Sequence, residues 1–240
     1  MLTPASTGER PNFACLVRSE ALRLRGWTER GGGWLVALCI GTILTGAGLY
    51  GAAMGSWRDP IQAGYVAVKF PLIVCLTAAG NALLNAMLAP LLGLNISLRQ
   101  SFLAVLISFA IAAAILGSFS PLIAFLVWNA PPMSEALRTS SPAHSLVLLS
   151  NVIAIAFAGV TANIRLEGML CALSGNASVA RRVLLAWLAV NLFLGSQLSW
   201  IFRPFIGSPG LPVEFLRSNA FEGSFYESVF RAFLRVLHSP

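Results

Sequence analysis

Long apolar runs, each about 20 residues long, dominate the pattern of hydrophobic and polar positions along the chain. A helix of about 20 apolar residues is long enough to cross a hydrocarbon core of about 30 Å. The pattern therefore predicts five transmembrane helices. They are expected over residues 34–54, 70–90, 102–118, 145–164 and 183–202.

The third run leaves the number of crossings open. Apolar residues resume in PLIAFLVW, residues 121–128, and Pro121 interrupts the regular hydrogen bonding of a helix. The segment is a kinked continuation of the third helix, a half-membrane dip or a further crossing. A further crossing would move the C-terminus to the other side of the membrane.

Both flanks of the apolar region carry amphipathic segments. FACLVRSEALRLRGW, residues 13–27, predicts a short interfacial helix, with an ordinary solvated helix as the alternative. SFYESVFRAFLRVLH, residues 224–238, carries charges every four residues opposite a broad apolar face, as amphipathic helices do. The chain thus divides into a basic head (1–33), a transmembrane domain (34–202), and a tail with a Pro-rich loop and an amphipathic helix (203–240).

The composition supports a membrane protein. Hydrophobic residues make up 57% of the chain and charged residues only 10%, whereas soluble domains average about 25% charged residues. The net charge of +7 comes mostly from basic residues in short segments between apolar runs. That placement favours a lipid bilayer with anionic headgroups as the partner and not nucleic acid. The expected fold class is an all-α polytopic bundle with interfacial helices at both ends.

The distribution of Lys and Arg predicts the orientation. With the N-terminus inside, the head and inner loops hold nine of them and the two outer loops hold three, whereas the tail, which five spans place outside, holds four. Inner loops are the basic ones in membrane proteins, so the N-terminus is expected in the cytoplasm and the tail outside. The absence of a long lumenal domain favours a bacterial cytoplasmic membrane. Lys69 and Pro71 mark the start of the second span, where the lysine is expected to snorkel towards the headgroups.

Amide side chains supply the polarity inside the predicted spans. Asn81 and Asn85 are four residues apart, so they share one face of a helix. An unpaired amide in hydrocarbon costs several kcal/mol, which favours hydrogen bonds to neighbouring helices. A polar pathway for a solute is the alternative. The complete set is Asn81, Asn85, Asn151, Asn163, Asn191 and Gln197.

The first span carries small residues at close-packing spacing. Gly51 and Gly55 form a GxxxG pattern, and Ala47 precedes Gly51 by four residues. Small residues at this spacing let two helix backbones approach closely. Packing within the chain is the favoured interpretation, with a homodimer contact as the alternative.

No pattern for catalysis or ion coupling is evident. The cores of the predicted spans lack the carboxylates and histidines that ion-coupled transporters place at depth. Glu167 and Arg165 come closest, as a charge pair at headgroup level; clustering with Arg182 would instead indicate a membrane enzyme. The cysteines lack metal-ligand spacing, and HExxH, GxSxG and phosphate-binding motifs do not occur. We therefore expect neither an enzyme nor a bound cofactor or metal.

Two segments carry a resemblance to a known family. In AGYVAVKFPL, residues 63–72, a lysine and a proline introduce a span, and LLGLNISLRQSF, residues 91–102, precedes the next. Over about residues 45–205 this order resembles bacterial Yip1-like membrane proteins of uncharacterised function. The resemblance implies a polar cytosolic head and about five closely spaced helices. Eukaryotic members bind small GTPases through the head, but this head lacks an acidic signature for such binding.

These observations favour a non-enzymatic scaffold or assembly subunit of a membrane complex, with another membrane protein or a second copy as partner. The alternative is a permease or facilitator component for a small neutral or lipid-like solute, lined by the amides. The two hypotheses differ in the expected interior. A polar cavity at mid-depth favours the permease, and a dry bundle favours the scaffold.

Overall fold

The computed structural model of the protein contains five long helices. It describes residues 12–13, 16, 25–28, 32–132, 143–206 and 212–227. Each helix is long and apolar enough to cross a membrane, and the described residues contain no strand. The prediction of an all-helical bundle with five such helices is confirmed. The helices are α3 (Gly33–Gly55), α4 (Pro60–Leu91), α5 (Leu98–Asn129), α7 (Ala143–Ser174) and α8 (Ala177–Phe202).

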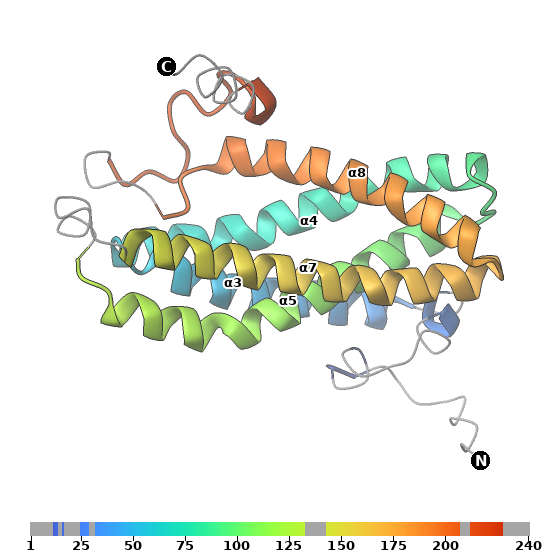
Figure 1. Cartoon of the computed structure of the whole chain (residues 1–240), viewed down its shortest axis with the longest axis horizontal. Coiled ribbons are helices and arrows are strands. Elements are labelled where there is room, and N and C mark those ends of the chain that lie inside the picture. The colour runs from blue at the N-terminus through green and yellow to red at the C-terminus, as the bar shows by residue number, and fades with distance from the viewer. Residues whose placement is uncertain are drawn as a thin grey trace, which may run out of the picture.

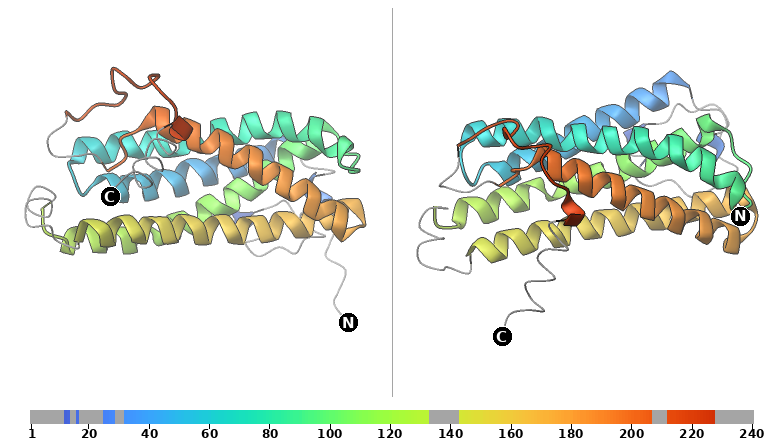
Figure 2. Two further views of the ribbon diagram at one scale, coloured as in Figure 1. Left: turned by 45° about the horizontal axis from the view of Figure 1, so that its top comes forward. Right: turned by 90° about the horizontal axis from the view of Figure 1, so that it is seen from above.

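The helices run alternately up and down in one elongated bundle (Figures 1 and 2). Helices α4, α5, α7 and α8 form a ring in which each packs against the next, and α3 packs against α4 and α5. We call the end with the α4–α5 and α7–α8 connections the head end. The opposite end, where α8 finishes, is the tail end.

Local sequence signals set the helix boundaries. Asp59 caps α4 by accepting a hydrogen bond from the Ile61 backbone N–H at 2.7 Å, and Pro60 follows at the first helical position. Ser97 and Gln100 form a capping box at the start of α5. Gly175 ends α7 with φ of +65°, a conformation that glycine adopts without strain.

Helices α4 and α5 are longer than the hydrophobic pattern predicted. Helix α4 begins at Pro60, ten residues before the predicted start of the second span, and Pro71 lies inside it. Helix α5 runs through Pro121 to Asn129. Segment 121–128 is therefore a continuation and not a dip or a further crossing. Proline is tolerated inside membrane helices because neighbouring helices and local adjustments compensate for the lost hydrogen bond.

Small residues bring α3 close to two neighbours. A Cβ added to Gly51 would lie 2.5 Å from the Val66 carbonyl oxygen, and Gly55 likewise meets the α4 backbone. Ala47 is fully buried in the core. The GxxxG pattern thus packs within the chain. The α3–α5 contact, which sequence analysis missed, rests on Gly46 and Gly117, since a Cβ on Gly117 would lie 2.8 Å from the Gly46 Cα.

Most of the two predicted amphipathic helices, 13–27 and 224–238, lies outside the described residues. In the described part, Leu16 is buried in the core, and Arg25 donates a 2.6 Å hydrogen bond to the Ala172 carbonyl near the end of α7. Tyr226 of the tail lies on α8, with its hydroxyl 2.6 Å from the Ser196 hydroxyl. Head and tail are thus both anchored to the bundle.

Candidate functional site

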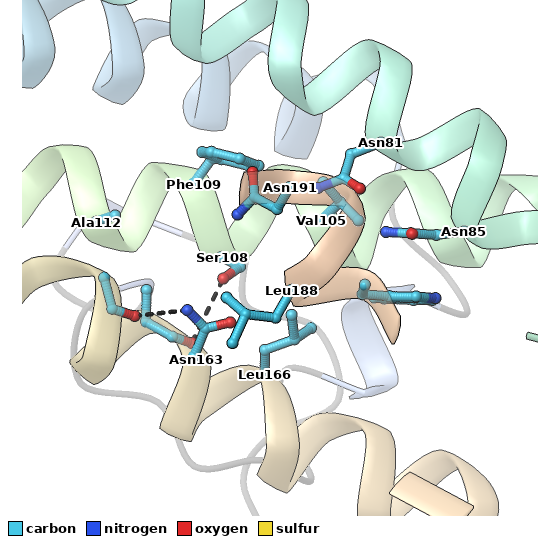
Figure 3. Close-up of a pocket in the computed structure, with 13 residues that line it drawn as sticks. Asn81, Asn85, Val105, Ser108, Phe109, Ala112, Asn163, Leu166, Leu188 and Asn191 are labelled. Carbon is cyan, nitrogen blue, oxygen red and sulfur yellow. Dashed lines mark hydrogen bonds between the residues drawn. The ribbon is translucent and has the colours of Figure 1, made fainter. Parts of the chain in front are cut away.

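A polar pocket lies inside the ring of α4, α5, α7 and α8 (Figure 3). Its volume is about 70 Å³. The four helices contribute asparagine amides, a serine hydroxyl and an indole N–H, and apolar groups complete the wall. The polar lining residues are Asn81, Asn85, Ser108, Asn163, Trp187 and Asn191.

Several hydrogen-bonding atoms of this pocket lack partners. Asn81, Asn85 and Trp187 are at most 2% exposed. Among the described residues, Asn81 Oδ1, both polar atoms of the Asn85 amide and Trp187 Nε1 have no hydrogen-bond partner. Leaving such a buried group unpaired costs about 1–3 kcal/mol. The pocket therefore presents two acceptors and two donors to whatever occupies it.

The pocket groups on the α7 side are already engaged. Asn163 Nδ2 donates a 2.8 Å hydrogen bond to the Gly159 carbonyl of its own helix. Ser108 donates a 3.4 Å hydrogen bond across to the Ala162 carbonyl. Unsatisfied hydrogen-bonding capacity is thus concentrated on the α4 and α8 walls, where Asn85 projects into the space in Figure 3.

The pocket lies deep within the bundle. Asn81 is ten residues before the end of α4 at Leu91, and Asn163 is eleven residues before the end of α7 at Ser174. At 1.5 Å per residue, both lie about 15 Å from the head end. Helix α4 has 32 residues, or about 48 Å, so Asn81 lies about one third of its length from the head end.

Two of the predicted amides lie elsewhere. Asn151 Oδ1 accepts a 2.8 Å hydrogen bond from the Tyr50 hydroxyl, which links α7 to α3. Gln197 Oε1 accepts a hydrogen bond from the Phe225 backbone N–H at 3.3 Å and so holds the tail on α8. Four of the six predicted amides therefore meet in one pocket, one links two helices and one anchors the tail.

A second polar site surrounds Lys69 near the tail end. Lys69 is fully buried, which corrects the expectation that it snorkels. Its Nζ donates hydrogen bonds of 3.3 Å to the carbonyls of both Pro204 and Glu214, and it lies 5.3 Å from the centre of the Phe215 ring. Because α4 begins earlier than predicted, Lys69 lies well inside the helix, and the tail covers it.

Gln62 holds the same tail segment. Its Nε2 donates hydrogen bonds to the carbonyls of Pro204 at 3.0 Å and Phe205 at 2.9 Å. Gln62 and Lys69 are seven residues apart and therefore share one face of α4. From this spacing, a longer α4 with a buried polar face could have been predicted. Trp187 and Ser108 of the pocket had no comparable signal.

At the head end, Glu167 pairs with Arg181, a residue that the sequence analysis had not singled out. Arg181 Nε donates a 2.9 Å hydrogen bond to Glu167, and Arg181 is largely exposed. Arg182 donates to the Ser178 carbonyl at 3.4 Å. Within the described ranges, no three His, Cys, Asp or Glu side chains are grouped as metal ligands, and Cys39, Cys75 and Cys171 are free thiols.

Comparison with known proteins finds no matching family model, curated protein or solved structure. The resemblance to bacterial Yip1-like proteins therefore stays a prediction.

Proposed function

We propose that this protein binds a small neutral polar solute in the pocket between α4, α5, α7 and α8, and acts as a permease or facilitator component. The observation that carries the proposal is the group of unpartnered atoms on Asn81, Asn85 and Trp187, buried inside the bundle. A scaffold needs no such cavity, because unpaired buried polar groups lower stability without adding an interface. The pocket thus favours the permease hypothesis over the scaffold hypothesis.

The chemistry of the pocket limits the solute. Its lining contains no charged side chain, so a neutral molecule is the matching ligand. The unpaired atoms comprise both donors and acceptors, so the solute must itself donate and accept hydrogen bonds. A cavity of about 150 Å³ accommodates benzene, and this pocket is about 70 Å³. Molecules of the size of urea or a short polyol fit these conditions.

Asn85→Leu tests the proposal because it removes both unpaired amide atoms and keeps a side chain of similar size. We expect solute flux into proteoliposomes, followed by light scattering with urea or glycerol outside, to fall to the level of protein-free vesicles. Thermal stability in detergent should stay the same or rise, since a buried unsatisfied group is replaced by an apolar one. Asn81→Leu should act in the same direction.

Leu84→Ala is the matched control, because Leu84 is adjacent on α4, is 40% exposed and does not line the pocket. Its flux should equal that of the natural protein. If Asn85→Leu lowers the melting temperature and leaves flux unchanged, the amide links helices and the permease proposal is wrong. Flux indistinguishable from empty vesicles for the natural protein would also contradict it.

A further inference from the structure

Three positively charged side chains gather where the tail covers α4. The carbonyls of Pro204 and Glu214 both bind the ammonium of Lys69. Arg203 directly precedes Pro204, and Arg217 follows Glu214 by three residues. The fold therefore brings a buried lysine and two half-buried arginines to one place at the tail end.

The positive charges of the two arginines act on each other. Partial burial and then the positive charge of Arg217 lower the pKa of Arg203 from its ordinary value. In the part of the chain that the structure describes, neither arginine nor Lys69 has a carboxylate within ion-pair distance. Glu214 contributes its main-chain oxygen to Lys69, and its carboxylate makes no ion pair. Among the described residues, the cluster thus carries positive charge without a counter-charge.

An unused hydrogen-bond donor lies beside the cluster. The guanidinium carbon of Arg203 is 3.5 Å from the centre of the Trp200 ring, and its Nη1 donates a 2.7 Å hydrogen bond to the Trp200 carbonyl. The indole Nε1 of Trp200 is buried and has no acceptor among the described residues. The guanidinium donors and the positive charge together match an anion with several acceptor oxygens, and guanidinium groups suit phosphate in particular.

The position of the cluster indicates the source of the anion. Arg203 caps the end of α8, and Trp57 and Trp128 also lie near helix ends at the tail end. Tryptophans at helix ends mark the level of lipid headgroups. Basic pockets between transmembrane helices bind the headgroups of anionic lipids.

We propose that Arg203 and Arg217, backed by the charge of Lys69, bind a phosphate group, supplied by the headgroup of an anionic lipid. This site is separate from the pocket, since Lys69 precedes Asn81 by twelve residues, or about 18 Å along α4. It requires no solute flux. It also accounts for how a buried lysine is stabilised at the edge of a membrane, because a lipid phosphate would supply the counter-charge that the described residues lack.

The experiment uses the purified full-length chain in detergent, with phosphatidylglycerol, phosphatidylcholine or inorganic phosphate added. Bound lipid is counted by native mass spectrometry, and thermal unfolding is followed in parallel. We expect phosphatidylglycerol to be retained and to raise the melting temperature, and phosphatidylcholine to do neither. The double variant Arg203→Gln/Arg217→Gln should bind phosphatidylglycerol at least about tenfold more weakly, the equivalent of one lost charge-assisted contact.

Arg182→Gln is the matched control, because Arg182 is exposed at the opposite end of the bundle and should leave lipid binding unchanged. Both arginines of the double variant are partly exposed, so the variant should still fold, and its own unliganded melting temperature is the baseline for its response to lipid. Equal retention of both lipids, or full retention by the double variant, would overturn the proposal. If inorganic phosphate stabilises the protein with the same dependence on the arginines and the lipid does not, the phosphate site stands and its lipid source is wrong.

Discussion

At the scale of single residues, buried polar groups in this protein have three different environments. Asn151 is satisfied by Tyr50 on another helix, whereas the Asn85 amide has no partner among the described residues. Lys69 is satisfied by main-chain oxygens of the tail. A buried polar group that is satisfied adds to stability, and one that is not satisfied lowers it. The same amide chemistry therefore has opposite consequences at Asn151 and Asn85.

The Tyr50–Asn151 hydrogen bond can be measured by a double-mutant cycle of Tyr50→Phe and Asn151→Leu. Interhelical hydrogen bonds in membrane proteins contribute about 0.6 kcal/mol on average and at most about 1.7 kcal/mol. We expect a coupling free energy in this range from unfolding in detergent. Tyr50→Phe combined with Asn163→Leu should be additive, because Asn163 bonds within its own helix. An additive Tyr50–Asn151 pair would show that the contact adds nothing to stability.

At the scale of elements, α4 joins the two sites. Its buried polar side chains follow one slowly turning stripe along the helix, from the tail-covered end to the pocket. Helix α5, by contrast, serves mainly as the central apolar helix. The stripe consists of Gln62, Lys69, Thr77, Asn81 and Asn85.

The crossing of α3 and α5 depends on glycine at its closest point. A Cβ on Gly46 would clash with the Ala113 carbonyl oxygen, whereas one on Gly41 would meet nothing within 4 Å. We expect Gly46→Ala to lower the free energy of unfolding by about 1–3 kcal/mol, as overpacking does. Gly41→Ala should be neutral or slightly stabilising, because alanine favours the helix. Equal melting temperatures for the two variants would contradict this account of the crossing.

At the scale of the whole molecule, the bundle has two polar sites at different depths. The pocket lies about 15 Å from the head end, and the basic cluster lies at the tail end. If the head faces the cytoplasm, the pocket lies nearer the inner side and the cluster faces the outer leaflet. The side of the membrane on which each site lies thus depends on the orientation of the bundle.

Cysteine labelling tests that orientation. In a variant with all native cysteines replaced by alanine, Asn95→Cys marks the head end and Asn219→Cys marks the tail end; both positions are exposed. An impermeant maleimide added to intact cells should label residue 219 and not residue 95, and should label both after permeabilisation. This expectation follows from the excess of Lys and Arg in the inner loops. Labelling of residue 95 alone in intact cells would reverse the orientation.

The sequence by itself determined the fold class and the number of long helices, because uncharged runs of about 20 residues have few stable alternatives to a membrane-spanning helix. The caps at Asp59, Ser97 and Gly175 are likewise local signals. The full lengths of α4 and α5 were missed because Pro71 and Pro121 are local breakers that neighbouring helices overrule. Hydropathy reports the apolar segment and not where the helix begins.

Only the tertiary structure decided which polar groups meet. The sequence singled out six amides, but their grouping into a pocket depends on the rotation of four helices about their axes. Likewise, the burial of Lys69 depends on a tail more than 130 residues away in the chain, whose carbonyls replace the water that a snorkelling lysine would reach. Periodicity defines a face of one helix, whereas packing decides what that face contacts.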